Sequence, residues 1–243
     1  MLYRTQKGRV SSGEPIGILL LDTSVPFIPG DVANASTYDF PVRFEKVEGF
    51  TVEKALRLDA AAYPALLQAA QNLVSQGVRA VTGDCGYMAL HQKRLAAELD
   101  VPVFLSSLLQ LPFILSIIGE RRKVGILTAG AAGLFSSLHE ALGFSSQERL
   151  CVQGLDTQPN FYRFAIEETG ELDAAAVEQE VIETAQELIE RDSSIAALLL
   201  ECSLLPPYSR ALQEAVALPV FDYITMIRHV FSATVQKQYH GII

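Results

Sequence analysis

Short runs of apolar residues recur along the chain, and each run ends in a polar or glycine-containing turn. Residues 16–22 (IGILLLD) are almost unbroken by polar side chains, which is typical of a strand buried on both faces of a sheet. Similar runs occur at 80–81, 101–105, 124–127, 195–200 and 220–221. Apolar residues at helical spacing lie between them, as in the segment that ends at Gly77 and the one that begins at Asp173. This alternation predicts an α/β fold with a mostly parallel sheet flanked by helices.

Part of the first half of the chain is repeated in the second half. The matched pairs are Cys85 with Cys202, Pro102 with Pro219, and Gly17 with Gly125. The first two pairs are separated by 117 residues and the third by 108, so a change in loop length accounts for the difference. The repeat predicts two pseudo-symmetric Rossmann-like halves, residues 1–121 and 122–243, with C-terminal elements that cross over.

Each cysteine of the matched pair follows an apolar strand and precedes a helix. Ligands of open parallel sheets bind beyond the carboxyl ends of the strands, and a helix N-terminus favours a thiolate. If the halves pack about a pseudo-twofold axis, Cys85 and Cys202 approach one cleft from opposite sides. The third cysteine, Cys151, has no counterpart, and we expect it to be a packed core residue.

Two thiols on opposite sides of a cleft suit one kind of chemistry. Inverting a carbon acid needs a base on one face of the carbon and an acid on the other, and the two exchange roles in the reverse reaction. Because an ordinary thiol has a pKa of about 8.5, one cysteine can act as thiolate and the other as thiol. The pattern predicts a cofactor-independent racemase or epimerase, with Cys85 and Cys202 acting next to a substrate carboxylate.

The sequence resembles the aspartate/glutamate racemase superfamily from about Pro15 to Met226. The resemblance rests on the two cysteine motifs, on the duplication, and on the loop LLDTSVPFIPGDVANASTYDFPV after the first strand. It implies two pseudo-symmetric α/β halves with the active site between them, and two cysteines that act as the bases without a cofactor or a metal. The superfamily includes amino-acid and hydantoin racemases, maleate isomerases and arylmalonate decarboxylases.

Seven further residues, all beside the strand ends or the two cysteines, are predicted to bind the substrate. They are Asp22, Thr23, Ser24, Gly86, Tyr87, Thr128 and Ser203. The resemblance implies contacts to the substrate carboxylate after the first strand, and a small glycine-rich turn entering a helix is suited to the same task. Asp84 and Glu201 precede the two cysteines. Because side chains alternate along a strand, we expect these two carboxyl groups to point away from the cysteines' direction and to hydrogen-bond to neighbouring side chains or to backbone rather than to the substrate.

The residues beside the cysteines differ from those of the amino-acid racemases in this superfamily. Those enzymes typically have Asn-Thr after the first cysteine and Gly and Thr around the second. This chain has Gly86 and Tyr87, and Glu201 and Ser203. A maleate-isomerase-like cis–trans isomerase or an arylmalonate-decarboxylase-like lyase is therefore an alternative, although the decarboxylases keep only one of the two cysteines. A non-catalytic small-molecule binding protein is the alternative from another class, but it has no need of two matched thiols.

Composition narrows the choice of partners. The 243 residues are 49% hydrophobic with a formal net charge of −9, which disfavours nucleic acid or an anionic membrane and leaves a small anionic carboxylate as the expected partner.

Three cysteines do not make a disulfide framework, and the N-terminus is not a signal peptide, so we expect a cytoplasmic protein. Metal-ligand spacings and dinucleotide or Walker motifs are missing, which predicts no cofactor and no metal. The apolar run 108–119 is too short to span a bilayer and is expected to be a buried helix or the contact of a homo-oligomer, most simply a dimer.

Overall fold

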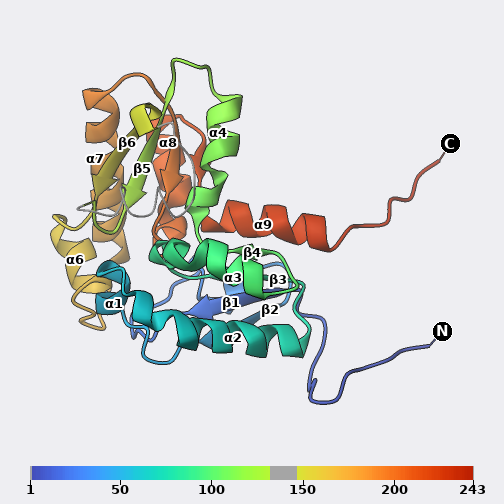
Figure 1. Cartoon of the computed structure of the whole chain (residues 1–243). Helices are drawn as coiled ribbons and strands as arrows, with labels where there is room; N and C mark the ends of the chain where they lie inside the picture. The colour runs from blue at the N-terminus through green and yellow to red at the C-terminus, as the bar shows by residue number, and fades with distance from the viewer. Residues whose placement is uncertain (1, 132–146, 243) are drawn as a thin grey trace.

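The computed structural model describes residues 2–131 and 147–242, and these residues form two four-stranded sheets (Figure 1). The first has the order β2-β1-β3-β4, with β1 (Ile16–Leu20), β2 (Val42–Lys46), β3 (Ala80–Gly83) and β4 (Val103–Phe104). The second has the order β6-β5-β7-β8, with β5 (Lys123–Thr128), β6 (Leu150–Gly154), β7 (Ile195–Leu200) and β8 (Val220–Phe221). Every paired strand in the two sheets is parallel, which confirms the predicted fold class.

The two sheets have the same register as well as the same strand order. In the first sheet Ile16 pairs with Val42 and with Ala80. In the second sheet Val124, which is the counterpart of Ile16, pairs with Leu150 and with Ala197. The partners in β1, β2, β5 and β6 are 108 residues apart, and those in β3 and β7 are 117 apart, as in the sequence repeat. The duplication is therefore a duplication of the whole strand framework.

Helices cover the sheets and join their strands. They are α1 (Val52–Leu56), α2 (Tyr63–Gln76), α3 (Gln92–Glu98), α4 (Leu111–Ile117), α6 (Pro159–Ala165), α7 (Ala174–Arg191), α8 (Ser209–Val216) and α9 (Tyr223–Thr234). Short 3₁₀ turns precede several of them, including η3 (Gly86–His91), η4 (Ser107–Gln110) and η6 (Pro206–Tyr208). Two helix boundaries confirm the sequence signals. Gly77 ends α2 in a left-handed conformation at φ +93°, and the Asp173 side chain accepts a hydrogen bond from the Ala176 N–H at 3.0 Å to begin α7.

The repeated glycines allow a helix to pack closely on the central strand of each sheet. A β-carbon at Gly17 would lie 3.0 Å from Leu73 Cδ1 of α2. At Gly125 it would lie 2.7 Å from Leu198 Cδ2 and 3.2 Å from Leu188 Cδ2 of α7. All three distances are shorter than ordinary carbon contacts, so a larger residue at Gly17 would push α2 away from its sheet, and one at Gly125 would displace both α7 and the Leu198 side chain of β7. The glycine shared by PIGIL and KVGIL is therefore a packing residue.

The last helix ties the two halves together. α9 follows the second sheet in sequence but packs on the first, where Ile224 and Ile227 share a buried cluster with Ile16 and Ile18 (Figure 1). The buried Tyr223 hydroxyl donates a hydrogen bond to the Leu105 carbonyl at 2.9 Å. This crossing fixes one half against the other and thus fixes the space between their strand ends.

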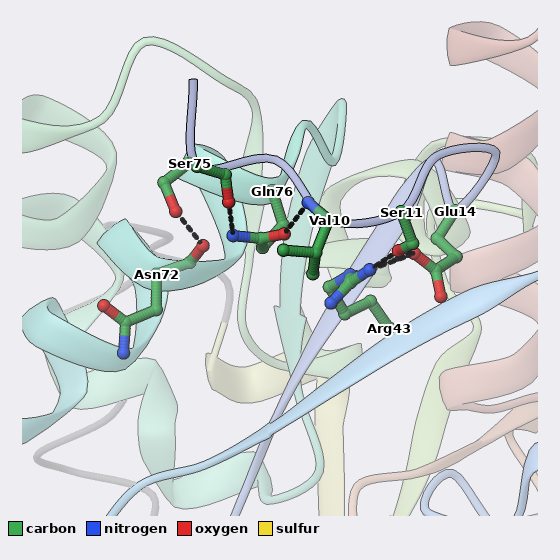
Figure 2. A network of polar contacts seen from close by, with 8 residues as sticks. Val10, Ser11, Glu14, Arg43, Asn72, Ser75 and Gln76 are labelled. Carbon is green, nitrogen blue, oxygen red and sulfur yellow. Dashed lines mark hydrogen bonds and ion pairs between the residues drawn. The ribbon is translucent and has the colours of Figure 1, made fainter. Parts of the chain in front are cut away.

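The segment before β1 is tied down by side-chain contacts (Figure 2). The Val10 N–H donates to Gln76 Oε1 at 3.3 Å, and Arg43 Nε and Nη2 donate to Glu14 Oε2 at 2.9 and 2.6 Å. These contacts hold the segment before β1 against the end of α2 and the start of β2. They therefore lie at the amino ends of the strands of the first sheet, away from the carboxyl ends.

The apolar run 108–119 covers most of η4 and the whole of α4. One side of this helix, including Leu111 and Ile114, is buried, whereas Phe113 and Ile117 are 59% and 57% exposed. The predicted dimer contact stays a prediction. Among the described helices, none is long and apolar enough to cross a membrane.

Candidate active site

A small cavity of about 60 Å³ lies at the carboxyl ends of the central strands, between the two halves. Its walls come from the segments after β1, β3, β5 and β7, together with α1 and the end of α6. The polar or reactive residues that line it are Thr23, Asp84, Cys85, Tyr87, Glu201, Cys202 and Ser203. The remaining walls are mostly apolar, and they include Phe27, Val52 and Ile166. A site at the carboxyl ends of parallel strands is where this kind of sheet binds ligands.

The two matched cysteines both line this cavity and have equivalent surroundings. Cys85 is half-buried and Cys202 is buried. The Tyr87 N–H lowers the pKa of the Cys85 thiol, and the Leu204 N–H lowers that of the Cys202 thiol. In each case the N–H group lies two residues further along the chain. The two thiols therefore line one cavity, as the sequence predicted.

Burial and negative charge keep both thiols protonated in the free protein. Burial is the main cause that raises the pKa of Cys85 and of Cys202 above the ordinary value, and the charge of Glu201 raises each of them further. The backbone N–H groups lower both pKa values, but by less. A thiolate in this site therefore has to be formed with the help of another group.

The two carboxyl groups beside the cysteines also line the cavity, in different ways. Asp84 Oδ1 accepts a buried hydrogen bond from the Leu21 N–H at 2.9 Å, as expected for a carboxyl group bonded to backbone. Glu201 Oε2 accepts a hydrogen bond from the Thr128 hydroxyl at 2.8 Å, and its Oε1 has no partner among the described residues. Glu201 is thus hydrogen-bonded to a neighbouring side chain and Asp84 to the backbone, the two kinds of contact expected from the sequence. Burial raises the pKa of Asp84 to about 8 and that of Glu201 to about 7.

Four of the seven predicted binding residues lie in the cavity wall. Thr23, Gly86, Tyr87 and Ser203 line it, although three of them also serve the structure. The Tyr87 hydroxyl donates to the Gly130 carbonyl at 3.1 Å, and the Ser203 hydroxyl donates to the Asp84 carbonyl. The Thr23 hydroxyl donates to the carboxylate of Glu168. These residues shape the cavity, and their role in binding stays a prediction.

The other three predicted binding residues are not part of the lining. Asp22 instead accepts a hydrogen bond from the Gly49 N–H at 3.0 Å and pairs with Lys46 at 3.3 Å, contacts that lower its pKa. The exposed Ser24 has its N–H directed to Glu168 Oε1 at 3.3 Å. Thr128 is fully buried and uses its hydroxyl to hold Glu201. Ala132 and Gly133, at the end of the predicted glycine-rich turn, lie outside the described residues.

Sequence reasoning missed Glu168, which joins the two halves at the rim of the cavity. It follows α6, its backbone has a left-handed conformation at φ +53°, and it accepts hydrogen bonds from two residues after β1. A contact across 145 residues leaves no periodic pattern in the sequence. The positive φ is unusual for glutamate, and only the structure reveals it.

Comparison with solved structures identifies the fold. Allantoin racemase from Pseudomonas fluorescens superimposes with a TM-score of 0.63, covering 94% of this chain and 99% of its own at 16% sequence identity. Arylmalonate decarboxylase gives a TM-score of 0.61 at 14% identity, covering 92% of this chain and 94% of its own. This chain has the fold of the aspartate/glutamate racemase superfamily. Glutamate racemase RacE1 from Bacillus anthracis, with a TM-score of 0.60 at 16% identity over 92% of this chain and 82% of its own, shares that superfamily fold.

The curated proteins that are similar in sequence are named as lyases, not as racemases or decarboxylases. Dimethylsulfoniopropionate lyase 5 from Emiliania huxleyi is 30% identical over 237 residues, which are 93% of this chain and 47% of that protein. Dimethylsulfoniopropionate lyase from Durusdinium sp. clade D is 29% identical over 219 residues, which are 86% of this chain and 71% of that protein. The chain therefore spans about half the length of the first of these relatives. No family model matches it.

Proposed function

We propose that this chain is a thiol-dependent lyase that removes a proton next to a carboxylate and expels a leaving group from the neighbouring carbon. The proposal is supported by relatives named dimethylsulfoniopropionate lyases, to which nearly all of the chain aligns. It makes the lyase alternative, rather than racemisation, the preferred function. Racemisation and this elimination share the first chemical step, because both begin by removing a proton from a carbon acid.

The charge of the cavity is the observation that carries the choice of substrate. Of the described residues in its wall, none is Lys, Arg or His, whereas Asp84 and Glu201 are both present. A dicarboxylate without a cationic group, such as maleate, would bring two negative charges to this wall. A zwitterion with one carboxylate and one onium group brings no net charge. Its cationic end is attracted by carboxylates and by the aromatic faces of residues such as Phe27 and Tyr87.

Elimination from such a zwitterion needs only one base. A thiolate takes the proton from the carbon next to the carboxylate, and that electron pair forms the new carbon–carbon double bond. The carbon–sulfur bond of the sulfonium group breaks, and its electrons leave with a neutral dialkyl sulfide. For dimethylsulfoniopropionate the products are dimethyl sulfide and acrylate, and one proton is released to water for each turnover. The dialkyl sulfide departs without being protonated, so a second thiol is not required as an acid.

Racemisation or epimerisation is the second candidate, favoured by the equivalent placement of the two thiols. Cys85 and Cys202 both line the cavity, and the pKa of each thiol is lowered by an N–H two residues on. Inversion would use the second thiol to return a proton to the opposite face of the carbon, so it would need both cysteines.

The test is to incubate the protein with dimethylsulfoniopropionate in deuterated water, with a parallel panel of amino acids, hydantoins, allantoin, maleate and arylmalonates. Headspace gas chromatography measures dimethyl sulfide, and NMR measures acrylate and the entry of deuterium. Equal amounts of dimethyl sulfide and acrylate support the lyase. Deuterium entry with inversion of a member of the panel, and no elimination, would instead establish the racemase.

A further inference from the structure

Among the described residues of the cavity wall, Glu201 is the one that has a buried side-chain oxygen without a hydrogen-bond partner. It is fully buried, its Oε2 accepts the Thr128 hydroxyl at 2.8 Å, and its Oε1 has no partner in the described part of the chain. Oε1 lies against Gly86 of the other half, so closely that a β-carbon there would overlap it. Glu201 therefore reaches from the end of β7 across to the residue that follows Cys85, with one carboxylate oxygen uncommitted.

An uncommitted buried carboxylate oxygen destabilises the folded state, so its presence in the cavity wall calls for an explanation. The thiols beside it are protonated in the free protein, and the reaction proposed above needs a thiolate. A buried carboxylate next to a buried thiol can accept its proton without a change in the net charge of the site, which a transfer to bulk water would not achieve.

We propose that Glu201 accepts the proton of the Cys85 thiol and so generates the thiolate that acts on the substrate, an inference that rests on the proposed function. The S–H bond breaks and an O–H bond forms at Oε1, which leaves a thiolate and a neutral carboxylic acid. The thiolate then takes the substrate proton, and elimination follows. Glu201 finally releases its proton to water, which restores the starting state with one proton released for each turnover.

The surroundings single out both the acceptor and the donor. The titratable groups that face Glu201 are Cys85 and Tyr87 from the segment after β3, Cys202 beside it, and Tyr223 of α9. Asp84, the other carboxyl group in the wall, already uses Oδ1 to accept the Leu21 N–H.

Cys85 is the donor for two reasons. Its neighbour Gly86 touches the uncommitted oxygen, and Cys85 is half-buried, whereas Cys202 is only 9% exposed. It can therefore meet both Glu201 and a substrate in the cavity.

The rate of alkylation of Cys85 by iodoacetamide, followed by peptide mass spectrometry from pH 5 to 10, tests this without any substrate. Wild-type alkylation is expected to rise with pH and to level off near pH 7, where Glu201 loses its proton, because transfer of the thiol proton to Glu201 needs no further loss of a proton to water. In Glu201→Gln this break near pH 7 is expected to disappear and the rate to keep rising with pH, because the thiol then ionises only at its own higher pKa.

The break near pH 7 is the signature of proton transfer to Glu201, because ionisation of the thiol to water alone gives a rate that rises steadily with pH. Asp84→Asn is the matched control, because Asp84 also raises the pKa of Cys85 and the amide oxygen can still accept the Leu21 N–H. We expect Asp84→Asn to speed alkylation and to keep the break. A wild-type profile without the break, its retention in Glu201→Gln, or its loss in both variants overturns the proposal.

Gly86→Ala provides a second route if Glu201→Gln does not fold. The added methyl group would overlap Glu201 Oε1 and lie 2.9 Å from the Glu201 carbonyl oxygen, so it displaces the carboxyl group but leaves its charge. The break near pH 7 is again expected to disappear, and its retention in a folded variant overturns the proposal. The pH profile of elimination should change in the same way. Failure of the protein to eliminate any substrate, with the alkylation results as expected, would refute the proposed lyase function and leave the role of Glu201 intact.

Discussion

The two halves of the molecule share one strand framework but use one matched pair of carboxyl groups differently. Asp84 and Glu201 occupy the same place in the repeat, 117 residues apart, directly before the two cysteines. Asp84 is held by a backbone N–H of its own half, at Leu21. Glu201, longer by one methylene, leaves an oxygen free and reaches the other half at Gly86. A duplicated fold has therefore acquired an asymmetric site, which suits a one-way elimination better than a symmetric inversion.

The largest effect that follows from this asymmetry is expected at Cys85. Replacing it by alanine removes the proposed base, so elimination should fall by about 10²–10⁴-fold, the usual contribution of a positioned base. Measured rates of dimethyl sulfide release provide the check. Cys151→Ala is the matched control, because Cys151 lies on β6 with its sulfur directed to Asp192 Oδ2 at 3.5 Å, and its rate should stay that of the wild type. Equal losses in both variants would mean that the cavity is not the site.

A smaller effect, on stability, is expected at Asp84, whose carboxyl group is hydrogen-bonded within the first half. Asp84→Ala leaves the buried Leu21 N–H without an acceptor, which should lower the free energy of unfolding by about 1–3 kcal/mol. Urea unfolding at pH 6 is the suitable measurement, because the carboxyl group, with a pKa of about 8, is then neutral and its burial adds no charge penalty. Asp84→Asn keeps the acceptor and should lie close to the wild type. A similar loss in both variants would contradict this account of Asp84.

The smallest effect is a dependence of stability on pH. Burial raises the pKa of Asp31 and Glu201 to about 7 and that of Asp84 to about 8. The folded state then holds these protons at pH values where the unfolded state has lost them, so stability is highest near pH 4–5 and decreases as the pH rises to about 8. Thermal unfolding should show a decreasing melting temperature over this range, with a smaller decrease in Glu201→Gln. A melting temperature that rises from pH 5 to 8 would contradict these assignments.

The sequence predicted the framework because backbone requirements leave local patterns. The apolar runs, the glycine shared by Gly17 and Gly125, and the matched cysteines all recur at fixed offsets, and the structure has the strands and helix boundaries that they imply. The contact of Asp22 with Gly49 and that of Thr128 with Glu201 could not be predicted in this way. They depend on side-chain directions in three dimensions, which no periodicity records.

The sequence alone could not show which charged residues face the cavity, and the choice between racemisation and elimination depended on them. Matched cysteines predicted symmetric chemistry, and a net charge of −9 gave no information about the few residues that face one cavity. Because the charge that matters is the local one, the wall with Asp84 and Glu201 and without a described basic residue became visible only when distant segments were brought together.

The most direct test of an asymmetric site is to compare Cys202→Ala with Cys85→Ala in the same elimination assay, with folding of both variants checked by circular dichroism. Cys202 lines the cavity beside Glu201 but is not the proposed base. Its replacement should therefore slow dimethyl sulfide release by no more than about tenfold, which corresponds to about 1.4 kcal/mol of barrier, whereas Cys85→Ala abolishes it. Complete and equal loss in both folded variants would show that the two thiols act as an obligatory pair, and would contradict the account.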